Sequence, residues 1–524
     1  MALLDNFDII LFHINFKKTM KKFYLLGASL LLLASCTERI SRMAPVGISF
    51  TEVSSLKIGG GTAAEITAFD PISKKLFVVN NDGGSRVDVI DFSDPRNLVK
   101  LTPISVAAFG GGVNSVAVKN GKLAIAVEGT VKTENGVVLV YATSDLSSPL
   151  ATVPVGALPD MVTFSPDGNL IVTANEGEPN STYTIDPVGS VSIIEVNKNF
   201  AVSTVGFEAF AGRKQELMAK GLRIFGPNAS FTQDIEPEYV TIDASSSTAW
   251  VTLQENNALA KVDLKRKVVT DIFPMGVKDH SLSGNELDVS DRDGVIGNLK
   301  NWPLLAYYLP DAITSFELGA NTFLITANEG DTRDYAAFGE EKRVNTLKLD
   351  EDAFPNLAEL IKEENLGRYT VTNSAGDTDG DGDFDVLYGI GARSFSIWNG
   401  RNGELVRDYK DLERDLLLAK PSLYDDGRSD NKGVEPEAVE IGKIQGRNIV
   451  FVGLERSDAI MVYELNGASG LRFLQLLDGV KFMGDSGHDA PEGLLFIPDF
   501  ESPTGRPLLV VSSEGDGRVT VYMN

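Results

Sequence analysis

The stretch Ile171–Asp186, IVTANEGEPNSTYTID, decides the fold, because versions of it recur along the whole chain. Its apolar run ends in an acidic tip, Asn175-Glu176-Gly177, and a second strand-like run follows at Gly189–Val196. Phe323–Arg333, FLITANEGDTR, repeats it almost letter for letter. A unit used this often indicates a repeat architecture. The weaker copies are LFVVNNDG (Leu76–Gly83), LAIAVEG (Leu123–Gly129), VTLQEN (Val251–Asn256), FVGLERSD (Phe451–Asp458) and VVSSEGDG (Val510–Gly517).

The units have the pattern of short antiparallel strands. Apolar and polar residues alternate with period two in short runs separated by Asp, Gly, Ser and Asn, as in Pro237–Asp243. We therefore predict an all-β chain folded as a seven-bladed β-propeller. A β-helix is the alternative, but it requires shorter and more regular repeats. The last unit lacks one strand, and Val46–Ile58 is a spare strand-like segment. We expect this N-terminal strand to close the last blade, which leaves no long exposed sheet edge.

The propeller domain is expected at residues 47–524, with insertions at 209–234, 265–309, 334–383 and 401–434. The last insertion contains a short helix, predicted at Asp411–Leu418. Long loops on a rigid scaffold are where function usually lies. The insertions are therefore the first places to look for it.

The start of the chain has the features of an export signal. Basic residues at Lys21-Lys22 precede the apolar run Phe23–Ala34, and the chain's only cysteine, Cys36, follows in a context that resembles a bacterial lipobox. Residues 1–19 would obstruct such a signal, so we interpret them as a mis-assigned start. Residues 20–36 are then a lipoprotein signal peptide and residues 37–46 a tether. We predict an exported protein, lipidated at Cys36 and anchored to the outer membrane or cell surface.

The chain is strongly acidic, which limits its partners. Its formal net charge is −25 at pH 7, with 73 acidic and 48 basic residues. Such a surface repels nucleic acid and anionic membrane, so we expect no nucleic-acid partner and membrane contact through the lipid alone. A small molecule, a glycan or a mineral ion is the expected ligand. The protein itself is expected to be a monomer.

Acidic residues recur at both ends of the predicted hairpins. In an antiparallel pair, the start of the first strand and the end of the second lie together, so these acids should gather at one mouth of the propeller. The openings include Glu65 and Asp160. These acids either bind cations or only cap turns and pair with neighbouring blades. The predicted ligand-binding mouth comprises Glu176, Glu178, Glu238, Asp311, Glu329, Asp331, Arg333, Asp334, Arg393, Glu437 and Glu492.

The strongest local motif is DTDGDGDFD at Asp377–Asp385. Alternating aspartates on a glycine-rich turn supply hard oxygen ligands, which suit Ca²⁺. The run matches the opening of an EF-hand loop but has Tyr388 in place of the final glutamate. We predict Ca²⁺ as the cofactor of an EF-like loop near the same mouth, although a solvated acidic turn is the alternative. The predicted ligands are Asp377, Asp379, Asp381, Asp383 and Asp385.

Several long motifs resemble a known family. The longest is SDRDGVIGNLKNWPLLAYYLPDAITSF (Ser290–Phe316); others are LITANEGDTRDY (Leu324–Tyr335), DTDGDGDFDVLYGIGARSFSIWN (Asp377–Asn399), GVEPEAVEIG (Gly433–Gly442) and APEGLLFIP (Ala490–Pro498). They are similar to the bacterial choice-of-anchor I family, which resembles the mesenchyme-specific cell-surface glycoproteins. The resemblance implies a surface-displayed seven-bladed propeller. Some members carry phosphatase labels.

Two functional hypotheses follow from these observations. The first is a surface-anchored, calcium-binding propeller that acts as a ligand-binding module without chemistry. The second is a calcium-dependent phosphoester hydrolase, similar to alkaline phosphatases or phytases, in which Arg333 and Arg393 clamp phosphate oxygens. Only three histidines are present, which excludes a histidine cluster for zinc, and no catalytic residue is assigned.

Overall fold

The structure is a computed structural model that describes residues 47–479 and 489–524. Cys36, the signal peptide and the tether predicted before residue 47 lie outside the described residues. Ser49–Asn524 form one compact unit. Among the described helices, none has the length and apolar content needed to cross a membrane.

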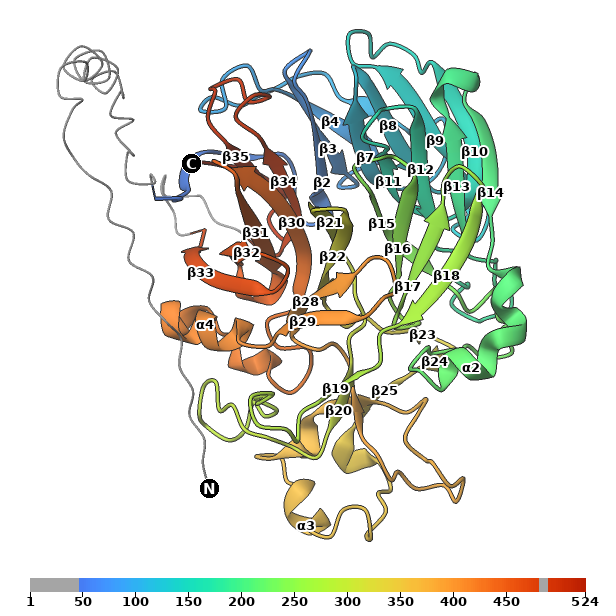
Figure 1. Cartoon of the computed structure of the whole chain (residues 1–524), viewed down its shortest axis with the longest axis vertical. Helices are drawn as coiled ribbons and strands as arrows, with labels where there is room; N and C mark the ends of the chain where they lie inside the picture. Colours follow the sequence, from blue (N-terminus) through green and yellow to red (C-terminus); the bar gives the residue numbers. More distant parts are fainter. Residues whose placement is uncertain (1–46, 480–488) are drawn as a thin grey trace, which may run out of the picture. The chain divides into compact units, whose positions relative to one another are not determined.

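The described residues form seven antiparallel sheets of four or five strands, numbered here in chain order (Figure 1). Sheets 1 to 3 consist of β2 (Ala63–Asp70), β3 (Lys75–Asn80), β4 (Arg86–Asp91), β5 (Val99–Lys100) and β6 (Ile104–Ser105); β7 (Val113–Lys119), β8 (Lys122–Val127), β9 (Asn135–Ala142) and β10 (Ala151–Ala157); β11 (Pro159–Phe164), β12 (Leu170–Asn175), β13 (Ser190–Glu195) and β14 (Ala201–Val205). Sheets 4 and 5 consist of β15 (Pro237–Ile242), β16 (Thr248–Leu253), β17 (Ala258–Asp263) and β18 (Val268–Pro274); β21 (Ile313–Leu318), β22 (Asn321–Asn328), β28 (Ser394–Asn399) and β29 (Leu405–Tyr409). Sheets 6 and 7 consist of β30 (Pro436–Ile444), β31 (Arg447–Leu454), β32 (Ala459–Asn466) and β33 (Gly470–Leu477); β34 (Pro491–Ile497), β35 (Leu508–Ser513), β36 (Arg518–Met523) and β1 (Thr51–Lys57).

The sheets are arranged in a cycle around their first strands. Each first strand contacts the next in the order β2, β7, β11, β15, β21, β30 and β34, and β34 contacts β2 again. The N-terminal strand β1 pairs antiparallel with β36 and supplies the outer strand of the last sheet. The predicted all-β propeller architecture, closed by an N-terminal strand, is confirmed. The cyclic arrangement places the first strands around a common axis.

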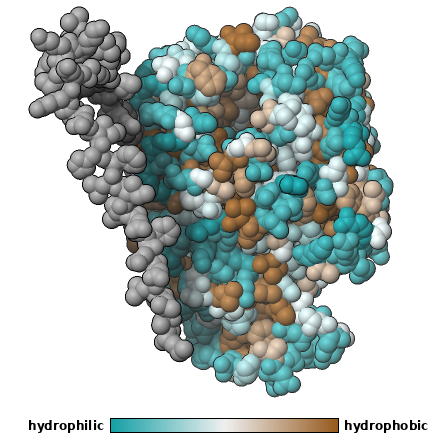
Figure 2. Space-filling model, viewed as in Figure 1, coloured by the Kyte–Doolittle hydropathy of each residue, from teal (hydrophilic) through white to brown (hydrophobic). Residues whose placement is uncertain are grey.

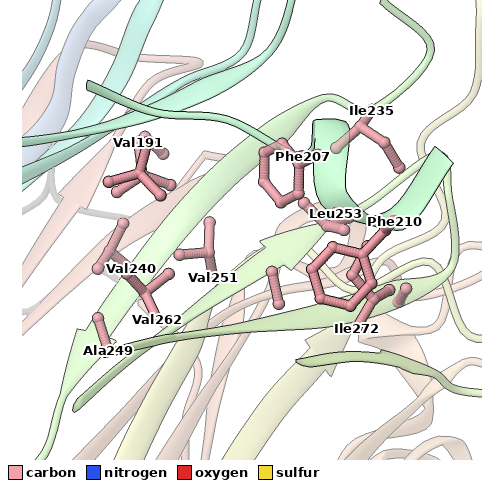
Figure 3. Close-up of a cluster of buried hydrophobic side chains, with 14 of the residues drawn as sticks. Val191, Phe207, Phe210, Ile235, Val240, Ala249, Val251, Leu253, Val262 and Ile272 are labelled. Atoms are coloured by element: carbon pink, nitrogen blue, oxygen red, sulfur yellow. The ribbon is translucent and has the colours of Figure 1, made fainter. Parts of the chain in front are cut away.

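Packing of sheet against sheet buries the inner strands on both faces. Every residue of β12 after Leu170 is buried, so its apolar run is continuous rather than alternating. Figure 3 shows the cluster between sheets 3 and 4, where Val191 lies opposite Val240 and Val251, and Phe207 packs near Leu253. The solvent-exposed face in Figure 2 is mostly hydrophilic, with small scattered apolar areas, in agreement with the acidic composition.

The insertions after sheet 4 and within sheet 5 fold together into a separate sheet of five strands, the insertion sheet. Its strands β19, β20 and β25 lie beside α3 in the yellow part of Figure 1, and β20 pairs in parallel with β27. This sheet has its own core, which includes Val344, Leu349, Tyr369 and Val371. The remaining strands and α-helices are β19 (Val277–Asp279), β20 (Leu305–Tyr307), β23 (Asp334–Tyr335), β24 (Phe338–Gly339), β25 (Glu341–Arg343), β26 (Thr370–Thr372), β27 (Tyr388–Gly389), α2 (Lys214–Met218), α3 (Leu357–Leu360) and α4 (Leu412–Ala419).

The insertion boundaries differ from the sequence-based ones. The predicted insertions 265–309 and 401–434 include β18 and β29, which are the outer strands of sheets 4 and 5. The insertion predicted to end at residue 383 continues to β28, which begins at Ser394. Outer strands are partly exposed and therefore less regular in their apolar pattern, so they resemble loop sequence. The predicted helix at 411–418 is confirmed as α4.

Candidate functional site

The start of each first strand lies opposite the end of the second strand, as antiparallel pairing requires. Pro159 pairs with Asn175 and Pro436 pairs with Leu454. Backbone hydrogen bonds also connect the acidic tips to the openings. In sheet 6, for example, the Glu455 amide donates to the Glu435 carbonyl at 2.9 Å. The opening acids and the tip acids therefore meet at one end of the sheets.

Backbone irregularities at the openings orient the acids. The register shifts between Pro159 and Val162, and a similar shift occurs near the start of β2, β7, β15, β30 and β34. Bulges of this kind change the direction in which a side chain points. In four openings the residue before the proline has a positive φ, which is uncommon for residues other than glycine. These residues are Leu158 (φ 48°), Leu309 (φ 47°), Glu435 (φ 46°) and Ala490 (φ 55°).

One opening side chain from each sheet faces a common cavity of about 360 Å³, the axial cavity. We call these seven side chains the axial ring: Glu65, Asn114, Asp160, Glu238, Asp311, Glu437 and Glu492. The cavity is also lined by Asn81, Ser115, Gln254, Glu329 and Asp331 and by the apolar or aromatic residues Ile66, Met161, Tyr239 and Ala312. No lysine, arginine or histidine is among the described residues that line it.

The six carboxylates of the axial ring lack basic partners. Across the described part of the chain, none of them forms an ion pair with lysine, arginine or histidine. One carboxylate oxygen in each of Glu238, Glu437 and Glu492 is buried without any hydrogen-bond partner. Charges withdrawn from solvent are normally paired. The ring is an exception, because the described residues provide it with no counter-charge.

Burial and mutual repulsion make these carboxyl groups hard to ionise. Burial, together with charge repulsion from the nearby Glu514, raises the pKa of Glu65 to about 8. Burial raises the pKa of Asp160 to about 7. Burial also holds the pKa values of the other four ring acids well above their ordinary range, and charge repulsion from neighbouring carboxylates adds to this. These four are Glu238, Asp311, Glu437 and Glu492.

At one edge of the cavity, Lys432 neutralises Glu329. Its Nζ lies 3.1 Å from Glu329 Oε1 and 2.9 Å from Asp331 Oδ1, and the other Glu329 oxygen accepts a hydrogen bond from Gln254 at 2.8 Å. Because both oxygens of Glu329 already have partners, this tip acid differs from the ring acids beside it.

The described residues contain four clusters of three acidic residues that could each hold one metal ion. Within each cluster, the ligand oxygens lie within 4.8 Å of one another. Arg428, Arg456 and Lys432 already neutralise the group around Glu435. The group of Asp311, Glu329 and Glu437 faces the axial cavity. Its all-oxygen composition suits a hard cation such as Ca²⁺. The four groups are Asp311, Glu329 and Glu437; Glu329, Glu435 and Glu455; Asp350, Asp383 and Asp385; and Asp377, Asp379 and Asp385.

The two arginines expected at the mouth are buried in ion pairs away from the cavity, which corrects that expectation. Arg333 Nη2 lies 2.7 Å from Glu236 Oε2, and its Nη1 contacts Asp234. Arg393 donates to the Asp288 carbonyl at 2.8 Å and pairs with Glu413 at 3.3 Å. Neither guanidinium is free to bind an anionic ligand.

The structure divides the nine acidic residues of the predicted mouth into two sets. The set that lines the axial cavity consists of Glu238, Asp311, Glu329, Asp331, Glu437 and Glu492.

Glu176, Glu178 and Asp334 do not line it in the described part of the chain. Glu178 pairs with Lys132, and Asp334 is exposed at the start of β23. Burial and the neighbouring Glu178 raise the pKa of Glu176.

The aspartate-rich loop lies between β26 and β27 of the insertion sheet, and none of its residues lines the axial cavity. Asp377, Asp379 and Asp385 point their carboxylates together. Hydrogen bonds within the loop already engage some of its carboxylate oxygens. Asp385 Oδ2 accepts one from the Thr378 amide at 2.7 Å and one from the Thr378 hydroxyl at 2.6 Å. These bonds hold the pKa of Asp385 below its usual value.

The other two predicted ligands point elsewhere. Asp383 lies beside Asp350 and pairs with Lys348 at 2.9 Å, and Asp381 belongs to neither group. Asp350 comes from a distant segment that the bridge between Leu349 and Phe384 brings alongside the loop.

Sequence reasoning missed the polar residues beside the acids of the site. Asn114 and Ser115 lie together in the opening of sheet 2 and could have been found by aligning the seven openings. Gln254 and Lys432 have no such signal, because they reach Glu329 only through tertiary packing.

Comparisons with known proteins identify similar sequences and a family model. Residues 65–468 match the family model of the choice-of-anchor I domain. Gigasin-3a from Magallana gigas is 32% identical over 182 residues, which cover 30% of this chain and 64% of that protein. The mesenchyme-specific cell surface glycoprotein of Strongylocentrotus purpuratus is 26% identical over 318 residues, which cover 51% of this chain and 41% of that protein. The chain thus spans less than two thirds of either relative.

Two solved structures are also similar. Kuenenia stuttgartiensis hydrazine synthase has a TM-score of 0.46 at 12% identity, over 90% of this chain and 97% of that chain. The β-propeller domain of Myceliophteria thermophila Cps50 (Swd1) has a TM-score of 0.46 at 9% identity, over 91% of this chain and all of that chain.

Proposed function

The chain belongs to the choice-of-anchor I family, and on that premise we propose that it is a surface-displayed β-propeller that binds a positively charged ligand in its axial cavity. The cavity acts as a binding site and carries out no reaction. Its ligand is small, because the cavity has a volume of about 360 Å³, at the lower end of the range for small-molecule sites.

The observation that carries this proposal is the lack of internal counter-charge in the axial ring. Elsewhere in the described residues, deeply buried acids such as Asp88 and Glu340 are paired with lysine or arginine. The ring acids have no such pairing, and a bound cation would let them ionise without mutual repulsion.

Surface display is supported by the sea urchin relative, which is named a cell surface glycoprotein. The order of basic residues, apolar run and cysteine at residues 20–36 supports anchoring through lipid on Cys36, exported to the outer membrane or cell surface. Mass spectrometry of the purified protein tests this point: the proposal expects an N-terminal diacylglyceryl-Cys36, and an unmodified cysteine would contradict it.

Calcium at the loop Asp377–Asp385 is the second part of the proposal. Its role there is structural, because the loop joins β26 to β27 within the insertion sheet and lies apart from the cavity lining. Asp377, Asp379 and Asp385 supply the ligands in this proposal, since their oxygens lie together.

Phosphoester hydrolysis is the less favoured function. An anionic phosphate in this cavity would face the six unpaired carboxylates of the axial ring as well as Glu329 and Asp331. The two arginines considered as phosphate clamps are already paired with Glu236 and Glu413. Only metal ions bound beforehand could provide the missing positive charge.

The test combines binding and turnover assays. The full chain is titrated with Ca²⁺ and with spermidine by calorimetry, and is assayed against an aryl phosphate and phytate with calcium or with chelator. The proposal expects that at least one cation binds and that the Glu238→Gln and Glu492→Gln variants bind it more weakly. It also expects no turnover. Calcium-dependent hydrolysis that is lost in Glu329→Gln would overturn the binding-only function.

A further inference from the structure

We propose that the axial cavity is a coordination site for a hard divalent cation, Ca²⁺ first, centred between Asp311 and Glu437. This inference rests on the proposed function and specifies its ligand as a metal ion rather than an organic amine.

The first support is the distance between the carboxylates. The ligand atoms of Asp311, Glu329 and Glu437 lie within 4.8 Å of one another. Ca²⁺ binds oxygen at about 2.3–2.6 Å, so two oxygens on opposite sides of one ion are separated by about 4.6–5.2 Å. The three carboxylates thus already lie at distances that a single ion can bridge.

The second support is the charge balance at this position. Lys432 and Gln254 occupy the oxygens of Glu329, whereas Asp311 and Glu437 have no ion pair among the described residues. Two unpaired carboxylates match the charge of one divalent ion. Glu437 also has a buried oxygen without a hydrogen-bond partner, which a metal ion would satisfy.

An independent observation comes from the opposite side of the cavity. Ser115 on β7 lines the cavity and is only 1% exposed, yet its hydroxyl has no hydrogen-bond partner. An unsatisfied buried hydroxyl costs about 1–3 kcal/mol, which a hydrogen-bonding partner in the cavity would remove. In this proposal that partner is a water bound to the ion.

The cavity volume limits the alternatives. A volume of about 360 Å³ accommodates an ion with its bound waters, but not a folded protein segment. An organic polyamine could enter, since ammonium groups also pair with carboxylates. The metal and the polyamine are therefore compared directly in the experiment.

The experiment measures Ca²⁺ and spermidine binding to the full chain by calorimetry. All variants carry Asp377→Asn, Asp379→Asn and Asp385→Asn, which disrupt both carboxylate clusters of the exposed loop as competing sites, because the two clusters share Asp385. The ring variant adds Asp311→Asn and Glu437→Gln, with Glu440→Gln as its control, because Glu440 is on the same strand but does not line the cavity. Ser115→Ala is matched by Ser513→Ala, another buried hydroxyl without a partner that lies outside the cavity lining.

We expect Ca²⁺ to bind in the loop-variant background. The ring variant should weaken it at least about tenfold, and Ser115→Ala should weaken it less, with unfolding midpoints in chelator unchanged. Both controls should bind as the background does. If the ring variant fails to fold, the comparison of Ser115→Ala with Ser513→Ala decides alone, and equal Ca²⁺ affinities in that pair overturn the inference.

Failure of this inference can be told apart from failure of the proposed function. Spermidine binding without Ca²⁺ binding, abolished in the ring variant, overturns the metal site and leaves the cationic-ligand function standing. The absence of binding by either cation overturns both.

Discussion

The molecule contains two sets of carboxylates, one buried and one half-buried, that differ in their partners. Around Arg333, Asp234 and Glu236 are buried, and the guanidinium contacts both of them. In the axial ring, six carboxylates from six different sheets converge on one cavity without a basic partner in the described chain. The chain therefore provides arginine for buried acids in one region and provides none in the other.

The difference teaches that acidity alone does not identify a binding site. A buried acid that is paired with an arginine already has its counter-charge, and removal of either partner destabilises the fold. A buried acid without one must stay protonated or take its counter-charge from solution. Only the second kind responds to an added cation, so the pairing of each acid is more informative than the number of acids.

The largest effect is expected where pairing is broken. Arg333→Met leaves Asp234 and Glu236 buried without a counter-charge, so we expect it to lower the free energy of unfolding by about 3–5 kcal/mol in urea denaturation. The matched control is Arg213→Met, whose solvent-exposed pair with Glu216 at 2.9 Å is screened by water and should contribute far less. Equal losses in the two variants would show that the buried pairing is not special.

A smaller effect is expected where pairing is introduced. Asn114 is the neutral member of the axial ring, so Asn114→Lys places an ammonium among the unpaired carboxylates. We expect the variant to be more stable than the parent in chelator, on the order of 1 kcal/mol, and to bind Ca²⁺ less tightly. Asn114→Gln, which changes length but not charge, should do neither. A variant that binds Ca²⁺ as tightly as the parent would contradict the counter-charge interpretation.

A third effect depends on pH and concerns Glu440, an acid on β30 outside the cavity lining. Burial raises its pKa to about 8, so the folded protein holds this proton at pH values where the unfolded chain has lost it. The parent therefore loses stability between the ordinary pKa near 4.5 and about 8 as pH rises, and the loss levels off above that range. Glu440→Gln cannot ionise, so its unfolding midpoint relative to the parent should increase from pH 5 to pH 8 and then stay constant. A difference that does not change with pH would contradict the assigned shift.

Much of the fold and part of the site could be predicted because they follow from local patterns. Period-two alternation and repeated tips define the strands, and antiparallel pairing alone places Glu238 and Glu437 at one end of their sheets. The spare segment before residue 58 predicted the closing strand β1 because the last unit was one strand short.

The remaining features depend on contacts between distant segments. Arg333 is 99 positions from Asp234, so nothing near Arg333 in the sequence indicates that it is paired rather than free. Lys432 reaches Glu329 across 103 positions, and Asp350 joins the aspartate-rich loop only because the insertions fold into one sheet. Pairing of this kind is set by tertiary packing, which the strand pattern does not contain.

The most direct test of the central claim is the position of a bound cation. Crystals of the full chain soaked in a terbium salt, used as a Ca²⁺ substitute, give an anomalous difference map that locates each metal without any assumption about ligands. We predict a peak in the axial cavity between Asp311 and Glu437, with Glu238 and Glu492 facing it. Peaks confined to the loop Asp377–Asp385, or no peak at a saturating terbium concentration, would contradict the claim that the axial ring takes its counter-charge from a metal ion.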